Sequence, residues 1–372
     1  MKEYLDGAEA DLLRRGEVLL GKIPSLQSRE FHLLSQRCRD KLNTLLNDIP
    51  KLAKYDTEIR LRRFKRIVAE IDLLEENAIA ALNRATDDDR FLNILIERIT
   101  REIQYPLLPP VVTSLSHGYF YIYPEYGLLA VPLGEADALL HLPDLYHELA
   151  HPLAEDKHDP RVKPFRLGLQ RALIEIQSYI ASEQEREQRS RGPQSYGHFL
   201  TVWWKSWNEG WLVEFFCDLF ATYTLGPAFV WSHLHLCAKR GEDAFDVPRY
   251  TYTSHPADDA RLRAMLLGLK IVGFAAEIPY IETKWQDFID IAGYTATPEY
   301  RRCFSGDLLK KIASIGFESV TQMGCRVATP STTDKIHVLF NTAWSEFWRA
   351  PKQYARWEEK AVGQLRQELA QP

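Results

Sequence analysis

One stretch decides how the chain is interpreted: DLYHELAHPLAED, residues 144–156. His147 and His151 stand four residues apart, so a helix would place both imidazole rings on one face. Glu148, which stands between them, could then take a proton from a water held by a metal ion at that face. A helix that happens to carry two histidines gives the same five letters, so the rest of the sequence has to decide.

The segment 207–229, WNEGWLVEFFCDLFATYTLGPAF, offers a further ligand. A catalytic zinc ion needs three protein ligands and one open position. Glu214 and Asp218 share one face of the predicted helix, and Trp207 and Trp211 favour burial of that face. If the face points inward, Glu214 would bind zinc and Asp218 would accept the imidazole N–H of a ligating histidine. A solvated stripe on an amphipathic helix is the alternative for these two acids.

A third element follows in residues 253–266, TSHPADDARLRAML. Pro256 suits the first position of a helix, which makes His255 the predicted N-cap and places Asp258 and Asp259 in the first turn. A histidine fixed there could donate a hydrogen bond to a developing oxyanion. A simple capping role for His255 is the alternative that this stretch alone favours.

Taken in this order, the three motifs resemble the gluzincin metallopeptidases of the zincin superfamily. The pattern is His-Glu-x-x-His, then Glu-x-x-x-Asp, then Ser-His-Pro with an arginine six residues after the histidine. It is similar to the branch that includes the heat-shock membrane protease and the CAAX-prenyl endopeptidase, and it covers roughly residues 125–270. The gap of 63 residues between His151 and Glu214 fits the long insert of that branch.

The resemblance implies a role for each matching residue. It implies one Zn²⁺ per chain, a general base, a hydrogen-bond partner for a ligand, and residues that stabilise the transition state or order the site. In this implied site His147, His151 and Glu214 are the zinc ligands, and Glu148 is the general base. Asp218 is the hydrogen-bond partner of a ligand. His255 and Arg261 stabilise the transition state or order the site.

Pro152 bears on the first motif. A proline disfavours the helical conformation of the residue before it and clashes with the carbonyl four residues back. We therefore expect the helix to stop at His151, which keeps both histidines usable.

The fold class predicted from the sequence is α+β and predominantly α. Residues 1–105 predict a helical bundle or arm, with helices over 3–21, 26–48, 55–84 and 89–103. The residues 111–135 predict a hairpin or small sheet, with the turn at Pro124–Gly127. We expect three parts: the helical domain 1–105, a zincin-like core over 106–280, and a C-terminal helical region over 281–372 that packs on the core.

Composition excludes several classes of protein. The chain has 372 residues, 45% hydrophobic and 26% charged, with a net charge of −5, which gives no general attraction to nucleic acid or anionic lipid. It lacks a run of about 18 uncharged apolar residues, so no membrane helix is expected, and the acidic start is unlike a signal peptide. Five scattered cysteines indicate a reducing, cytoplasmic setting.

Two further patterns carry less weight. The basic stretch RLRRFKR, residues 60–66, predicts a solvated helix face, and phosphate binding is the alternative. His233 and His235 stand two apart and would face different sides of a helix, which argues against a second metal site.

The sequence thus predicts a soluble zinc-dependent metallopeptidase that acts on a peptide or protein substrate. The N-terminal helices are a possible site for a protein partner. The other hypothesis is a helical interaction protein whose zincin-like metal site is structural or inactive. The intact Glu148 argues against it, because a purely structural site has no use for a base.

Overall fold

The computed structural model describes residues 2–24, 29–84, 86–116, 118–191, 198–240 and 243–370. The chain is predominantly helical with one three-stranded sheet, which confirms the predicted α+β class. It divides into two compact units. Unit 1 comprises Met1–Ile96, Pro109–Ala136 and Leu369–Pro372, and unit 2 comprises Glu97–Leu108 and Asp137–Glu368. The three-part division and the zincin-like core stay predictions.

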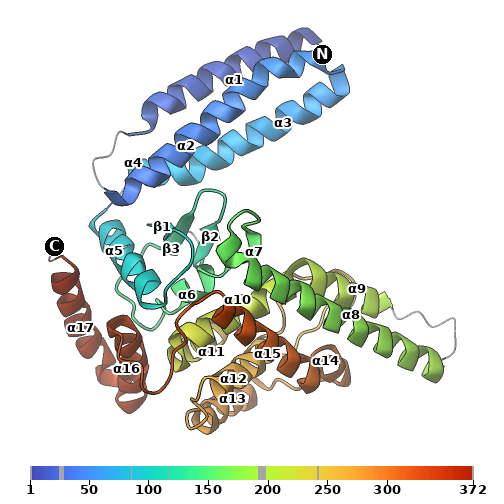
Figure 1. Cartoon of the computed structure of the whole chain (residues 1–372), viewed down its shortest axis with the longest axis vertical. Helices are drawn as coiled ribbons and strands as arrows, with labels where there is room; N and C mark the ends of the chain where they lie inside the picture. Colours follow the sequence, from blue (N-terminus) through green and yellow to red (C-terminus); the bar gives the residue numbers. More distant parts are fainter. Residues whose placement is uncertain are drawn as a thin grey trace. The chain divides into compact units, whose positions relative to one another are not determined.

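Unit 2 is built around one buried helix, α10 (Leu212–Leu225), which contacts α6, α11, α12 and α15 (Figure 1). Its residues are almost all buried, so α10 lies at the centre of the core of this unit. Among the helices described, none is long and apolar enough to cross a membrane. The other helices are α6 (Asp144–Glu148), α7 (His151–Glu155), η3 (Pro160–Val162), α8 (Lys163–Arg191), α9 (His198–Ser206), η4 (Trp207–Trp211), α11 (Pro227–Arg240), α12 (Asp258–Ile271), α13 (Ile278–Ala292), α14 (Pro298–Cys303), α15 (Gly306–Gln322), α16 (Lys335–Arg349), η5 (Pro351–Gln353) and α17 (Tyr354–Leu369).

The helix of the first motif differs from the expectation at Pro152. Helix α6 already ends at Glu148, and a second short helix, α7, begins at His151 with Pro152 in its first turn. Leu149 and Ala150 between them keep right-handed helical backbone angles. The reason is that Pro152 has no N–H for the carbonyl of Glu148, so the hydrogen-bond ladder breaks although the chain keeps its direction.

The start of α12 also differs from the expectation. The N-cap is Ala257 and the helix begins at Asp258, so the prediction of His255 as N-cap is wrong. The backbone N–H of Asp259 bonds to the carbonyl of Ala244 at 3.0 Å, so another segment satisfies an amide that a capping side chain would otherwise take. Asp258 and Asp259 lie in the first turn, as predicted.

Unit 1 contains three long helices that lie alongside one another (Figure 1). Ile67, Ile71, Leu74 and Ala78 are buried in its core, as their spacing predicts. Residues 26–28 of the second predicted helix lie outside the described residues. The helices are α1 (Lys2–Lys22), α2 (Arg29–Asp48), η1 (Ile49–Lys54), α3 (Thr57–Leu73), the π-helical turn η2 (Leu74–Ile79), α4 (Ala80–Asn83) and α5 (Asp87–Glu102), which continues into unit 2.

The basic stretch 60–66 is only partly the solvated face that the sequence predicted. Arg60 is buried, and its guanidinium donates to Glu9 at 2.6 and 2.8 Å and to Asp6 at 2.6 Å. Arg62, Arg63, Lys65 and Arg66 are exposed. One cation of the stretch therefore joins α3 to α1.

The sheet of unit 1 has the strand order β1-β3-β2. Strands β2 (Tyr121–Tyr123) and β3 (Leu128–Pro132) form an antiparallel hairpin, which confirms the predicted turn at Pro124–Gly127. Gly127 adopts φ +59°, a backbone angle that favours glycine. Strand β1 (Val111–Ser116) pairs parallel to β3 and forms an edge of the sheet.

Side chains of α5 satisfy the free edge of β1. The Asn93 amide donates to the carbonyl of Val112 at 2.7 Å and accepts from its N–H at 2.9 Å, as a neighbouring strand would. Asp89 accepts from the N–H and the hydroxyl of Ser114 at 2.6 and 2.8 Å. All four residues are buried, so these bonds replace water at the edge strand.

We expect Asn93→Ala to destabilise unit 1 by about 2–4 kcal/mol, because both backbone groups of Val112 would stay buried without partners. Urea unfolding followed by circular dichroism measures the loss. Asn77→Ala is the matched control, since the Asn77 amide makes an exposed hydrogen bond to the carbonyl of Leu73, four residues back. Equal midpoints for the two variants would contradict this role of Asn93.

Candidate metal centre

The first two sequence motifs meet in the core of unit 2. His147 and Glu148 end α6, and Glu214 and Asp218 face His147 from α10. These four residues are buried, with exposed fractions of 8%, 7%, 9% and 0%. The alternative of a solvated acidic stripe on α10 is therefore wrong, and the carboxylates need partners inside the protein.

His147 lies between the two carboxylates of α10. Its Nδ1 lies 2.9 Å from Asp218 Oδ1, and its Nε2 lies 3.4 Å from Glu214 Oε2. The second histidine, His151, points its Nε2 at Glu214 Oε1 from 3.9 Å. The three residues predicted as ligands thus direct donor atoms toward one another.

Arg261 of α12 fixes the carboxylate of Asp218. Its Nε and Nη2 donate to the two oxygens of Asp218, both at 2.7 Å, and Nη2 also lies 3.9 Å from Glu214 Oε2. This bidentate pairing fixes the plane of the Asp218 carboxylate, which is also the hydrogen-bond partner of His147. Arg261 is itself buried, and ordering of the site was one of the two roles that the resemblance implied for it.

His255 lies at the open side of the group. Its side chain is 62% exposed, and its Nε2 lies 3.9 Å from Glu214 Oε2. The loop before it rests on η4, where Trp211 Nε1 donates to Thr253 Oγ1 at 3.0 Å. A Cβ at Gly210 would lie 2.6 Å from the carbonyl oxygen of Ser254, so only glycine permits this approach. The sequence therefore brings His255 to the site through the loop and not through a helix cap.

The two histidines have opposite electrostatics. Burial lowers the pKa of His147, but its hydrogen bonds and charge interactions with Asp218 and Glu214 outweigh burial and raise that pKa to about 10. Burial lowers the pKa of His151 to about 4, and the neighbouring charge of His147 adds to this. The surroundings of His147 thus favour a positive charge on its imidazole, whereas the imidazole of His151 stays neutral.

Both carboxylates of α10 are held ionised. Burial alone would raise the pKa of Glu214, but His147 and Arg261 lower it to about 2. Burial likewise opposes ionisation of Asp218, but Arg261 and His147 hold its pKa well below the usual range. Their two negative charges face the positive charges of Arg261 and protonated His147, so a metal ion that bound His147 would take the place of its proton in this balance.

The distances can be compared with those of a bound zinc ion. Ligand atoms about 2.1 Å from a tetrahedral zinc ion lie about 3.4 Å from one another. The nitrogens of His147 and His151 lie 3.4 and 3.9 Å from Glu214 oxygens, and the rings of the two histidines lie 5.1 Å apart. Imidazole and carboxylate are also donors that zinc accepts, so each histidine–glutamate distance is compatible with the ion, although the two distances go to different oxygens of Glu214.

Cys217 is the residue that the sequence interpretation missed. One ligand atom from each of His147, His151 and Cys217 lies within 4.8 Å of the others, a group that could hold a metal ion. Cys217 follows Glu214 by three residues, so it shares the ligand face of α10, and that spacing was the available signal. Burial raises the pKa of its thiol well above the usual range, and the charges of Glu214 and Asp218 raise it further.

A second group of potential ligands also lies in unit 2: His233, Cys237 and Asp258. His233 pairs not with His235 but with Cys237, which stands four residues away on the same face of α11.

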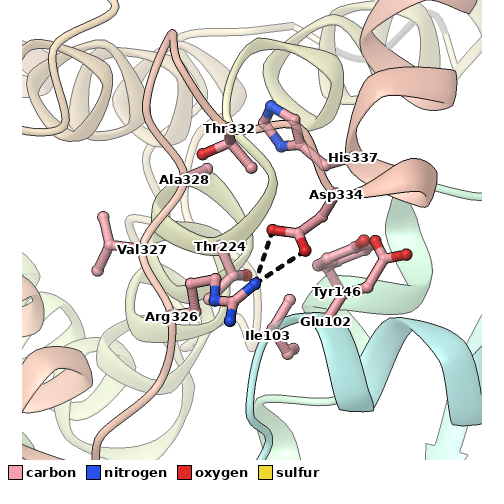
Figure 2. A pocket seen from close by; sticks show the side chains of 10 residues that line it. All are labelled: Glu102, Ile103, Tyr146, Thr224, Arg326, Val327, Ala328, Thr332, Asp334 and His337. Carbon is pink, nitrogen blue, oxygen red and sulfur yellow. Dashed lines mark hydrogen bonds and ion pairs between the residues drawn. The ribbon is translucent and has the colours of Figure 1, made fainter.

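Figure 2 shows a hollow elsewhere in unit 2, lined by Tyr146, Thr224 and His337 among others. Arg326 Nη1 donates to both oxygens of Asp334 there, at 2.8 and 3.0 Å. The cavity volume is about 10 Å³, which holds about one water molecule. None of the candidate ligands is among its described lining residues, so the hollow is not a substrate cleft for the metal centre.

No family model, curated protein or solved structure matches the chain. The interpretation of the metal centre therefore rests on the residues and distances described above.

Proposed function

We propose that the protein is a zinc-dependent metallopeptidase in which His147, His151 and Glu214 hold one Zn²⁺. One observation supports this most directly: His147 Nδ1 lies 2.9 Å from Asp218 and Nε2 faces Glu214. Ligating histidines in metal sites commonly donate their other N–H to a carboxylate, which orients the ring and fixes its tautomer. The Nε2 that carries a proton between these carboxylates could hold a metal ion in place of that proton.

Charge balance supports a divalent ion. In the proposed site Glu148, Glu214 and Asp218 supply three carboxylates, and among the described residues the guanidinium of Arg261 faces the last two. A divalent cation with neutral imidazole ligands cancels the remaining charge. Two histidines also favour zinc over magnesium or calcium, which prefer oxygen ligands.

When bound, zinc would polarise the scissile carbonyl and lower the pKa of a water molecule. Glu148 stands one residue after His147 and three before His151, beside both ligands but not among them. In this proposal Glu148 accepts the proton of the attacking water and passes it to the leaving amine. Because Glu148 is buried, its carboxylate is kept from competing bulk water.

His255 is proposed to stabilise the oxyanion of the substrate. Ser254 Oγ lies 3.0 Å from His255 Nδ1, and a hydroxyl that donates to Nδ1 leaves the proton on Nε2. That Nε2–H is then available to donate to the oxyanion. The substrate would approach on this side, because the side chains of His255 and His151 are 62% and 21% exposed whereas those of His147 and Glu214 are 10% and 11% exposed.

The choice of a peptide substrate rests on the resemblance to the gluzincins, whereas the residues themselves support zinc-dependent hydrolysis. The other candidate, a helical interaction protein with a structural or inactive metal site, lacks a use for Glu148. Zinc-dependent cleavage in a broad peptide library would separate the two. A cytosolic setting and a protein partner for the N-terminal helices stay predictions.

The first prediction concerns metal content, measured by elemental mass spectrometry on the purified full chain. We expect His147→Ala and Glu214→Ala to lose the zinc of this site, because each removes one of three ligands. Cys217→Ala is the matched control from the same helix and should retain the metal. Zinc that survives Glu214→Ala but is lost in Cys217→Ala would assign the third ligand to the cysteine.

The second prediction concerns the base. Glu148→Gln keeps the size of the side chain but cannot accept a proton, so kcat for peptide cleavage should fall by about 10²–10⁴-fold. Zinc content should stay unchanged, because Glu148 is not a ligand. Turnover at the level of the unchanged chain would remove Glu148 from the mechanism.

The third prediction concerns Asp218 as a positioning residue. Asp218→Asn keeps a hydrogen-bond acceptor for His147 but removes the charge, so we expect zinc affinity to weaken by about 10–100-fold. Competition with a chromophoric chelator measures the affinity. Asp287→Asn, a half-exposed carboxylate on α13, is the control for loss of one negative charge. Equal affinities in the two variants would show that Asp218 does not tune the metal.

A further inference from the structure

The second group of potential ligands joins two helices of unit 2. His233 and Cys237 stand four residues apart on α11, and Asp258 is the first residue of α12. One ligand atom from each lies within 4.8 Å of the others. His233 and Cys237 are 2% and 3% exposed, and Asp258 is half-buried. The group therefore has a buried thiol and imidazole with a carboxylate at its more open side.

The contacts around His233 fit a shared metal ion. Cys237 Sγ lies 3.5 Å from His233 Nε2. Sulfur and nitrogen ligands on one tetrahedral zinc ion lie about 3.6 Å apart, given Zn–S and Zn–N bonds of about 2.3 and 2.05 Å. The same Nε2 lies 3.2 Å from the backbone carbonyl of Asp258, which brings the start of α12 to the histidine. In this contact Nε2 donates its proton to the carbonyl, so a zinc ion would have to displace that proton.

We propose that His233, Cys237 and Asp258 form a second zinc site, distinct from the metal centre of His147, His151 and Glu214. Thiolate, imidazole and carboxylate together select a borderline-soft divalent ion and disfavour calcium and magnesium. Three side chains leave one position of a tetrahedral ion to water.

The structure also indicates what this second site would do. Arg261 follows Asp258 by three residues on α12 and holds Asp218, which holds His147. An ion that ties Asp258 to α11 would fix the first turn of α12 and with it the position of Arg261. The second zinc is thus a positioning element for the first site, and it takes no part in the chemistry.

The test uses the full chain with His147→Ala and Cys217→Ala, which disables the first site. After the metal is stripped, equilibrium dialysis against buffered zinc should show about one zinc per chain, the number that one tetrahedral site holds. Cobalt in place of zinc should give a sulfur-to-cobalt charge-transfer absorption. Adding Cys237→Ala should abolish both, whereas Cys303→Ala, which removes a buried cysteine outside both groups, should leave both intact.

Three results would overturn the proposal: no zinc uptake in the background chain, equal uptake with and without Cys237, or cobalt binding without the sulfur absorption. If Cys237→Ala does not fold, as judged by circular dichroism, Asp258→Asn replaces it, because Asp258 is half-buried. If the background itself does not fold, Cys237→Ala in the unchanged chain should lower the zinc content by one equivalent, whatever the first site holds. Failure of the first site leaves these readouts unaffected, since the background already lacks it.

Discussion

Asp218 is the residue on which the organisation of the candidate metal centre depends. It is completely buried on α10 and accepts hydrogen bonds from His147 on α6 and from Arg261 on α12. A carboxylate without water is tolerated only where opposite charges and donors compensate for it. The hydrogen bonds of Asp218 therefore hold α6, α10 and α12 together. The same arrangement places His147 Nε2 against Glu214. The positions of the candidate ligands His147 and Glu214 thus follow from the need to compensate the buried charge of Asp218.

Much of the fold was predictable because its helices have strong apolar periodicity. The buried residues Ile67 and Ile71 and the hairpin around Gly127 are local features, set by spacing and by turn chemistry. The edge of β1 was not predictable, since Asn93 and Asp89 satisfy it from a helix that precedes the strand. Nor was the burial of Arg60, because its partners Glu9 and Asp6 lie more than 50 residues away.

The site was predictable to the extent that its motifs lie on regular helices. Spacing of three or four residues set the shared faces of His147 with His151 and of Glu214 with Asp218. The N-cap prediction for His255 failed because a tertiary bond from Ala244 satisfies the amide of Asp259, which no local pattern shows. Cys217 was missed for a different reason. A single cysteine in an apolar helix predicts only a small buried side chain, because free cysteine usually packs like a small apolar residue.

Glu214 and Cys217 offer two chemically different third ligands on the same helix, and the protein environment discriminates between them. Glu214 faces His147 and Arg261, both of which stabilise its ionised form. Cys217 is buried among acids, so its thiolate is opposed by the charges that zinc would have to offset. An ion that enters the site meets a carboxylate already prepared to bind and a thiol that must first lose a proton. The charges therefore favour the carboxylate, whereas the distances group the thiol with the two histidines. In the proposed enzyme, two imidazoles and one carboxylate would keep the open position and moderate ligand charge that hydrolysis needs.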